Sequence, residues 1–378
     1  MEQFSSNSTL LIVFLIVSLI ICIPIQTRGE IGFGRHVKNG SDPMVPAILV
    51  FGDSTMDPGN NDYIATTFRS NFAPYGRDFA NHEATGRFTN GRLVTDFVAS
   101  YLGIKKYVPA YLDLSLSDQE LLTGVSFASG GNGYDPLTPQ LSGVISMQRQ
   151  LEYFKEYKSR IEKLVGGEKA DYIVKSAGYV ISAGTNDFVV NYYSTTLPVR
   201  RNTYSVGEYQ KFLLQNVQEF IQGLWKEGSR KMAVVGLPPM GCLPDVITTN
   251  SRSIFQGREC VESLSSISRE YNQQFQSQLD VLQRQFAAED QNTKLAYIDI
   301  YTPIANMVQE PSKYGFEEVN RGCCGTGYVE TIFLCNPIST TCTDDSKYVF
   351  FDAIHPTEKA YNIIFQYIRP VIDSLVSS

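Results

Sequence analysis

Two short segments near opposite ends of the chain hold the residue types that acyl-transfer chemistry needs. Ser54 lies three residues after the end of the apolar run PAILVF at 46–51, and Asp352 and His355 stand three residues apart near the C-terminus. A serine hydroxyl is a poor nucleophile until a base removes its proton, and a third group must hold that base in one tautomer. Each residue alone also fits a turn, a helix cap or a satisfied polar group. Their combination favours Ser54 as nucleophile, His355 as base and Asp352 as the group that orients His355.

Two Gly-containing segments could stabilise the oxyanion that such a reaction forms. The stretch 127–133 reads FASGGNG, and its backbone N–H groups can point at developing negative charge. The segment 184–187 reads GTND and places Asn186 directly after another apolar run, so its side-chain N–H could donate to the same charge. The structural alternatives are an ordinary loop for the first segment and a helix cap for Asn186.

Other catalytic motifs fit the sequence poorly. The nearest approach to a GxSxG elbow, GVSFA at 124–128, fails at its last position. His82-Glu83 lacks the second His of a zinc protease, there is no P-loop, and the Gly-rich stretch lacks the third Gly of a dinucleotide fingerprint. We therefore expect no metal and no cofactor.

Composition indicates a globular protein with a large core. The chain has 378 residues, of which 43% are hydrophobic and 19% charged, and its formal net charge is −7. An acidic chain without a basic run argues against a nucleic-acid partner, because phosphate binding needs clustered Lys and Arg. The sequence does not indicate an oligomeric state.

The N-terminal residues are typical of a secretory signal. An apolar run at 10–23 is 14 residues long and ends at a proline, which is too short to span a bilayer comfortably. The alternative is an uncleaved anchor, and no Lys or Arg precedes the run. We expect a signal peptide at 1–29, an N-terminal extension at 30–45 with a sequon at Asn39, and one large domain at 46–378. The mature protein is then secreted, extracellular and without integral membrane association.

Cysteine usage agrees with export. One of seven Cys lies in the apolar run of the signal, and an even number in the remaining secreted chain suggests three disulfides. Adjacent Cys323 and Cys324 are too close to bond each other, so we expect them to reach separately to Cys335 and Cys342, in either order. The remaining pair, Cys242 and Cys260, would close a local loop. A four-Cys zinc site is the alternative, but it lacks paired CxxC knuckles.

Short apolar runs alternate with longer helical patterns. The strands predicted from apolar runs bounded by Gly, Asp or Pro are 46–51, 178–184, 231–236 and 294–300. The predicted helices are 92–102, 144–164, 207–227, 261–287 and 357–374. Strands separated by helices imply a parallel sheet covered on both faces, with ligands bound beyond the carboxyl ends of the strands.

Seven landmarks in order make the chain resemble the plant-type GDSL esterases/lipases of the SGNH hydrolase superfamily, over about residues 46–375. They are FGDSTMDPGNNDY (51–63), TGRFTNGR (85–92), FASGGNGYD (127–135), SAGTNDFVVNYY (182–193), GLPPMGCLP (236–244), RGCCGTGYVE (321–330) and FFDAIHPTEKAY (350–361). The resemblance implies an α/β fold, a three-layer α/β/α sandwich with a mainly parallel, flavodoxin-like sheet.

The resemblance also implies roles for individual residues. Ser54 would be the nucleophile, His355 the base and Asp352 its orienter. The oxyanion donors would be the backbone of Ser54, a glycine of the second block and Asn186. Spacing favours Gly131 over its neighbour as that glycine.

Two positions depart from the family pattern. The fourth letter of the GDSL signature is Thr55, and a position often occupied by Asn is Ser126. The nucleophile itself is unaffected by the first change. The second lies in the Gly-rich block and bears on the geometry of that loop.

The expected activity is that of a cofactor-free serine esterase or lipase acting on small-molecule or lipid carboxylic esters. There are two alternatives. One is an acyltransferase with the same triad, and the other is a non-catalytic lipid- or wall-binding protein on this scaffold. Six aromatic residues near the motifs either line an acyl groove or belong to the core: Tyr63, Phe72, Tyr75, Phe188, Tyr192 and Tyr193.

Overall fold

The computed structural model describes residues 44–193, 198–250 and 257–377. The expected signal peptide at 1–29, and all but the last two residues of the expected extension at 30–45, lie outside the described residues. The sequon at Asn39 lies outside them too.

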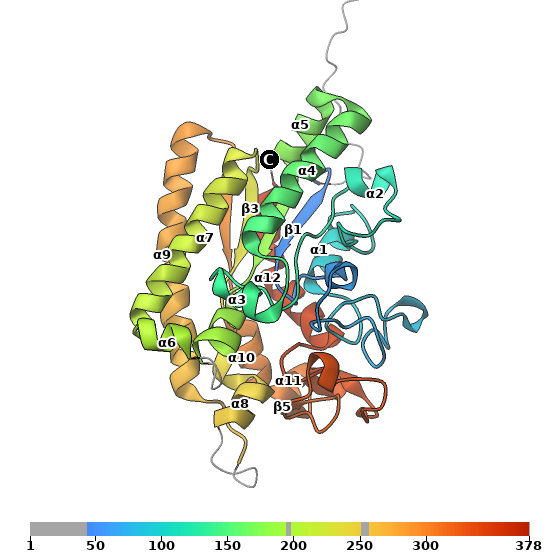
Figure 1. The fold of residues 1–378 in the computed structure, drawn as a ribbon, viewed down its shortest axis with the longest axis vertical. Helices are drawn as coiled ribbons and strands as arrows, with labels where there is room; N and C mark the ends of the chain where they lie inside the picture. Colours follow the sequence, from blue (N-terminus) through green and yellow to red (C-terminus); the bar gives the residue numbers. More distant parts are fainter. Residues whose placement is uncertain (1–43, 194–197, 251–256, 378) are drawn as a thin grey trace, which may run out of the picture. The chain divides into compact units, whose positions relative to one another are not determined.

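A four-stranded parallel sheet forms the centre of the fold (Figure 1). Its strands, in spatial order, are β1 (Ile48–Gly52), β2 (Gly178–Ser182), β3 (Lys231–Val235) and β4 (Lys294–Ile298). All four coincide with predicted strands. Every residue of β1 and β2 is buried, which is why these strands read as continuous apolar runs in the sequence.

The outer edge of β1 is covered by an extended segment at 123–129. Val50 donates its N–H to Val125 O at 3.1 Å, and Phe127 donates to Val50 O at 2.7 Å. A parallel bridge joins Val50 to Ser126. The segment 123–129 comes after β1 and before β2 in the chain. It lies on one side of β1, whereas β2, β3 and β4 lie on the other side. That is the strand order of a flavodoxin-like sheet.

The alternation of side chains along each strand separates two cores. In β1, Leu49 and Phe51 pack into one core, whereas Ile48 and Val50 pack into the other. The first core is covered by α4 (Met147–Val165), α5 (Gly167–Ser176), α7 (Val206–Lys226) and α9 (Glu262–Glu289). The second is covered by α1 (Val94–Tyr101), α10 (Tyr301–Gln309) and α12 (Glu358–Val376). The predicted three-layer α/β/α sandwich is confirmed.

The long helices begin where their sequences provide caps. The Ser205 hydroxyl accepts the Glu208 N–H at the start of α7, and the Thr357 hydroxyl accepts the Ala360 N–H at the start of α12. All five predicted helices form, with ends within a few residues of the prediction. The sequence prediction missed α5 and α10, and also the shorter helices α2 (Asp118–Leu122), α3 (Leu137–Ser142), α6 (Val199–Thr203), α8 (Pro244–Asn250) and α11 (Pro311–Tyr314).

Three disulfides and a second small sheet hold the C-terminal loops. The pairs are Cys242–Cys260, Cys323–Cys342 and Cys324–Cys335. The expected pairing is confirmed, and the order left open by the sequence is decided. Strand β5 (Glu318–Gly322) pairs in parallel with β6 (Tyr348–Phe350), which the sequence prediction missed. The segment 321–324 is therefore fixed directly beside the strand that precedes Asp352 and His355.

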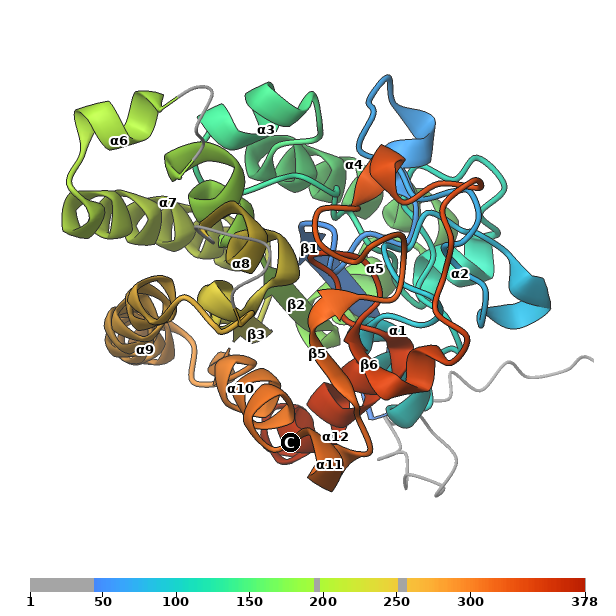
Figure 2. The ribbon, with the colours of Figure 1, turned by 90° about the horizontal axis from the view of Figure 1, so that it is seen from below.

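The view from below looks onto the edge of the sheet where the strands end (Figure 2). The pair β5 and β6, helix α8 and the loop that follows β1 gather there. Among the described residues, no helix is both long and apolar enough to cross a lipid bilayer.

Candidate active site

Ser54, His355 and Asp352 form one continuous chain of hydrogen bonds, although Ser54 lies 301 residues from His355. The Ser54 Oγ is 2.8 Å from His355 Nε2, and His355 Nδ1 is 2.7 Å from Asp352 Oδ2. With Nδ1 donating to the carboxylate, Nε2 is left to accept the serine proton. The Phe88 ring packs against the imidazole at 5.2 Å between centroids and helps to shield it from water.

The loop between β6 and α12 positions both Asp352 and His355. Phe351 donates its N–H to His355 O at 2.7 Å, which closes the loop. The Asp352 Oδ1 accepts the N–H groups of Ile354 at 2.8 Å and His355 at 2.7 Å. Asp352 is completely buried and His355 nearly so. The carboxylate therefore has a fixed orientation before any substrate arrives.

Tyr75 is a further partner of the triad that sequence reasoning missed. Its hydroxyl donates to Asp352 Oδ2 at 2.7 Å and accepts the N–H of Ile332 at 3.0 Å. Burial and the neighbouring Asp352 raise the pKa of Tyr75 well above its usual value, so the hydroxyl stays protonated and remains a donor. Of the two alternatives that the sequence left for Tyr75, groove or core, the structure supports the core, because its side chain is almost completely buried. No local pattern identifies it, because its partner lies 277 residues away.

Ser54 follows a tight turn that needs a glycine at position 52. Gly52 has φ +137°, and a Cβ there would approach the Ser182 carbonyl oxygen to 1.9 Å. Gln150 clamps this glycine by accepting its N–H and donating to its carbonyl, both at 2.8 Å. Two neighbouring segments thereby fix the exit of the chain from β1 towards Ser54.

Thr55, which departs from the family signature, contributes to the same turn. Its N–H and hydroxyl donate to Asp53 Oδ1 at 3.0 and 2.8 Å, and its hydroxyl lies 3.3 Å from Ser182 Oγ. Burial raises the pKa of Asp53 to about 6.

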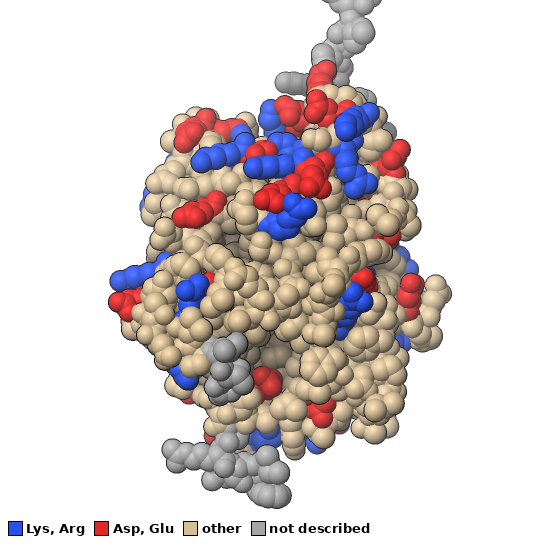
Figure 3. Space-filling model, viewed as in Figure 1, with Lys and Arg blue, Asp and Glu red and all other residues tan. Residues whose placement is uncertain are grey.

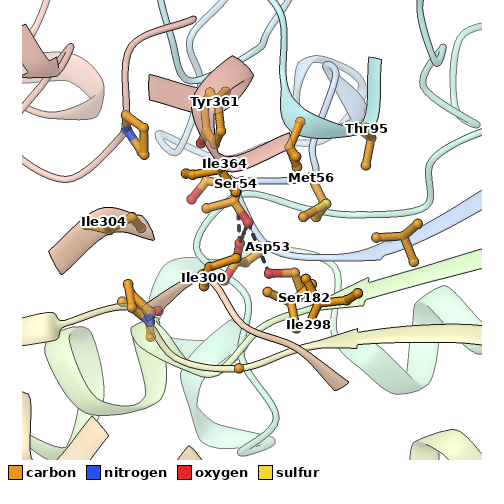
Figure 4. Close-up of a pocket in the computed structure, with 18 of the residues that line it drawn as sticks. Asp53, Ser54, Met56, Thr95, Ser182, Ile298, Ile300, Ile304, Tyr361 and Ile364 are labelled. Atoms are coloured by element: carbon orange, nitrogen blue, oxygen red, sulfur yellow. Dashed lines mark hydrogen bonds between the residues drawn. The ribbon is translucent and has the colours of Figure 1, made fainter. Parts of the chain in front are cut away.

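Beneath Ser54 an apolar cavity extends between the sheet and α12, with Tyr361 and Ile364 on its helix side (Figure 4).

The Gly-rich segment places one backbone donor near Ser54 and uses its neighbour elsewhere. Gly130 donates its N–H to Asp57 Oδ2 at 2.9 Å, so that group is already occupied. In the described part of the chain, the N–H groups of Gly131 and Ser54 have no hydrogen-bond partner. Gly131 lines the same pocket as Ser54, has φ +86°, and a Cβ there would lie 2.5 Å from the Phe68 ring. The geometry favours Gly131 over Gly130 as an oxyanion donor.

Asn186 lies in the same pocket and does not cap the turn that follows it. Its Nδ2 donates one N–H to Asn132 O at 2.8 Å, and its side chain makes no capping bond to the helical segment Asp187–Tyr192. An amide nitrogen carries two N–H groups, so the second remains for a ligand. The bond to Asn132 also joins the two oxyanion segments predicted from the sequence.

Buried carboxylates hold these two segments together. Asp187 accepts the N–H groups of Tyr134 at 2.7 Å and Asp135 at 3.1 Å, and the hydroxyl of Thr138 at 2.6 Å. Burial raises the pKa of Asp187 to about 7. Asp135 in turn pairs with Arg200 at 2.6 and 2.7 Å. The sequence motifs contained Asp187 and Asp135 but did not reveal this positioning role.

Ser126, the second departure from the family pattern, is fully bonded. Its hydroxyl donates to Met56 O at 2.8 Å and accepts the Ala128 N–H at 3.2 Å. Asn60 reaches the same loop and donates to the carbonyl oxygens of Ser126 and Ala128 at 2.8 and 2.9 Å. The loop is therefore well supported with a serine at this position.

The pocket in front of Ser54 is mainly apolar. Its lining is Ser54, Phe68, Phe88, Gly131, Thr185, Asn186, Val189, Val190, Asp245, Thr331, Ile332, Ile354 and His355. Of the six aromatic residues considered for a groove, Phe188 and Tyr193 line an adjoining hollow, and none lines this pocket. Within the ranges that the structure describes, no three His, Cys, Asp or Glu side chains are grouped as metal ligands.

Comparisons with known proteins agree with this architecture. The family model described as GDSL-like Lipase/Acylhydrolase matches residues 48–368, which is most of the chain. The chain belongs to the GDSL esterase/lipase family. Relatives from Arabidopsis thaliana include GDSL esterase/lipase At5g45960, 53% identical over 88% of each chain. GDSL esterase/lipase At2g31540 is 46% identical over 87% of this chain and 90% of its own, and GDSL esterase/lipase APG is 46% identical over 85% and 89%.

As a plant-type member of this family, the protein is a carboxylic ester hydrolase, and small-molecule esters are its class of substrate. Among solved structures, BT4096, a gut microbial diltiazem-metabolizing enzyme, aligns with 87% of this chain and 47% of its own. At 11% identity and a TM-score of 0.34, that likeness carries no argument.

Proposed function

We propose that this GDSL esterase/lipase is a secreted serine esterase that uses Ser54, His355 and Asp352. The observation that carries the proposal is the unbroken chain of short contacts, 2.8 Å from Ser54 to His355 and 2.7 Å from His355 to Asp352. Each contact is within the range needed for proton transfer to a base whose tautomer is held by a carboxylate.

In the first step, His355 Nε2 takes the proton of Ser54 Oγ as that oxygen bonds to the ester carbonyl carbon. The carbonyl oxygen becomes negatively charged, and the free N–H groups of Ser54, Gly131 and Asn186 donate to it. Such preorganised donors stabilise charge that develops only in the transition state, by roughly 3–4 kcal/mol each. When the C–O bond to the alcohol breaks, His355 returns the proton to the leaving oxygen. A water molecule, activated in the same way by His355, then releases the acid from Ser54.

Secretion is supported by two independent features. The apolar run at 10–23 has the length of a signal core, and the six remaining cysteines form three disulfides. Disulfides persist in oxidising compartments and are rare in the cytosol. One of them, Cys323–Cys342, lies close to the loop that holds the catalytic base, so an oxidising environment favours an ordered site.

The test is the variant Ser54→Ala in the purified mature protein. Hydrolysis of a short-chain chromogenic ester should fall by roughly 10⁶-fold, the scale seen when a serine hydrolase loses its nucleophile. Ser229→Ala is a matched control, because Ser229 is also buried and its hydroxyl bonds to Met232 Sδ at 3.2 Å, near the start of β3 and not in the pocket of Ser54. A serine-directed organophosphate should label Ser54 in the wild type and in this control. Activity near the wild-type level in Ser54→Ala, or label on another residue, would refute the assignment.

A further inference from the structure

One acidic side chain lines the mainly apolar pocket in front of Ser54. Asp245, the second residue of α8, lines this pocket and also the adjoining hollow, with which the pocket shares Val189 and Val190. Figure 3 shows a hollow on one face of the molecule with an acidic side chain at its edge. Because Asp245 lines both the pocket and the hollow, it stands where the pocket in front of Ser54 meets the adjoining hollow.

In the part of the chain that the structure describes, no donor or cation bonds the Asp245 carboxylate. Its pKa is raised to about 6 by burial and, to a smaller extent, by the charge of Asp352. The other buried carboxylates around the site all accept hydrogen bonds, Asp53 from Thr55 and Asp57 from Gly130, for example. The Asp245 side chain is half-buried and still reaches solvent, so a ligand that displaces water from the pocket must supply hydrogen-bond donors to this carboxylate in place of that water. An acidic residue in the first turn of a helix is favourable in itself, but this does not require it to face a pocket.

The position of Asp245 identifies the part of an ester that it would contact. Its N–H donates to Ala353 O at 2.9 Å, so it is fixed to the loop that carries His355. Because His355 must pass its proton to the leaving oxygen, the alcohol moiety departs on this side of the pocket. The N–H groups of Gly131 and Asn186 would instead donate to the carbonyl oxygen.

We propose that Asp245 accepts hydrogen bonds from hydroxyl groups on the alcohol moiety, so that the enzyme prefers esters of polyols with free hydroxyls to esters of simple alkanols. This inference rests on the proposed function. Arg201 lines the adjoining hollow and its positive charge disfavours a cationic alcohol there. A polyol, in contrast, offers donors to Asp245 and acceptors to Arg201.

The experiment compares two butyrate esters that differ only in two hydroxyl groups, glycerol 1-monobutyrate and n-propyl butyrate. For the wild type, kcat/KM should be about tenfold or more higher for the glycerol ester, the value of one hydrogen bond to a charged acceptor. Asp245→Asn should lower that ratio about tenfold. Asp245→Leu should lower it further and raise kcat/KM for the propyl ester, since an apolar side chain suits an alkyl group better than a carboxylate.

Glu168→Gln is the matched control, because it removes the same charge from the first turn of α5, away from the pocket. It should leave the ratio unchanged, and the melting temperature of each variant should show that it is folded. An equal effect of Asp245→Asn on both esters would refute the inference while leaving the esterase assignment intact. A wild-type preference for butyrylcholine over both esters, abolished by Asp245→Asn, would replace the polyol with a cation. A wild type that cleaves no ester would refute the proposed function together with this inference.

Discussion

Removing the Tyr75 hydroxyl tests whether the proposed triad depends on a residue that does not line the pocket in front of Ser54. In Tyr75→Phe the ring keeps its packing against Phe72, Phe88 and Phe351, at centroid distances of 5.9, 6.2 and 5.6 Å. The change is therefore confined to one oxygen. Asp352 loses one of four donors, and the Ile332 N–H loses its acceptor.

The expected magnitude follows from those bonds. A hydrogen bond to a charged group contributes about 1.5–3 kcal/mol, so the free energy of unfolding should fall by about 2 kcal/mol. The ionised Asp352 keeps its other three donors, but only His355 Nδ1 still bonds to Oδ2, so the imidazole is held less firmly. If about half of the lost energy is expressed in the transition state, kcat falls roughly fivefold. KM should stay within about twofold, because Tyr75 does not line the pocket.

The assay combines urea unfolding with kcat and KM for a short-chain ester. Tyr157→Phe is the control, since Tyr157 is fully buried and donates to Leu121 O at 2.8 Å, away from the site. It should lose stability and keep its kcat. A Tyr75→Phe variant that loses stability in the same way but keeps wild-type kcat would show that Tyr75 is only structural. An effect on KM alone would also refute the reasoning.

Three further predictions follow from the site and its supports. Asn186→Ala should lower kcat by roughly 10²–10³ with a smaller change in KM, and a loss confined to KM would contradict the oxyanion role. Burial raises the pKa of Asp57 and that of Asp187 to about 7, so at pH 5–6 the folded protein holds protons that the unfolded chain has released. The free energy of unfolding should therefore fall as pH rises towards 7–8. Asp57→Asn should make this dependence on pH less steep, by up to about 1.4 kcal/mol per pH unit. Urea unfolding at several pH values measures it, and the same pH dependence in the variant and the wild type would argue against the prediction. Mass spectrometry of a non-reduced digest should find no free thiol in the mature protein and the pairs Cys242–Cys260, Cys323–Cys342 and Cys324–Cys335. Reduction should cost roughly 3 kcal/mol per bridge, and an unchanged melting temperature after full reduction would oppose this.

Much of this protein could be read from its sequence because the relevant signals are local. The four strands of the central sheet are mainly apolar runs, with every residue of β1 and β2 buried, and two of the long helices carry their own caps, at Ser205 and Thr357. The candidate triad was also readable, since Ser54 follows a strand and Asp352 and His355 share one short loop. Residues that are neighbours in the chain need little tertiary information to be placed together.

The remaining features of the site depend on contacts between distant segments. Tyr75 lies 277 residues from Asp352, and Asp245 reaches the loop of His355 through a backbone bond to Ala353. The choice between Gly130 and Gly131 as oxyanion donor also depends on a distant residue, because the Gly130 N–H is already bonded to Asp57.

The pairing of Cys323 with Cys342 and of Cys324 with Cys335 likewise follows from the position of β5 beside β6. The sequence alone determined which residue types were available for the chemistry and where the strands and long helices lie. Tertiary structure decided which of those residues meet. The reason is physical: hydrogen bonds and disulfides act over a few ångströms in space, and spacing along the chain does not specify those distances.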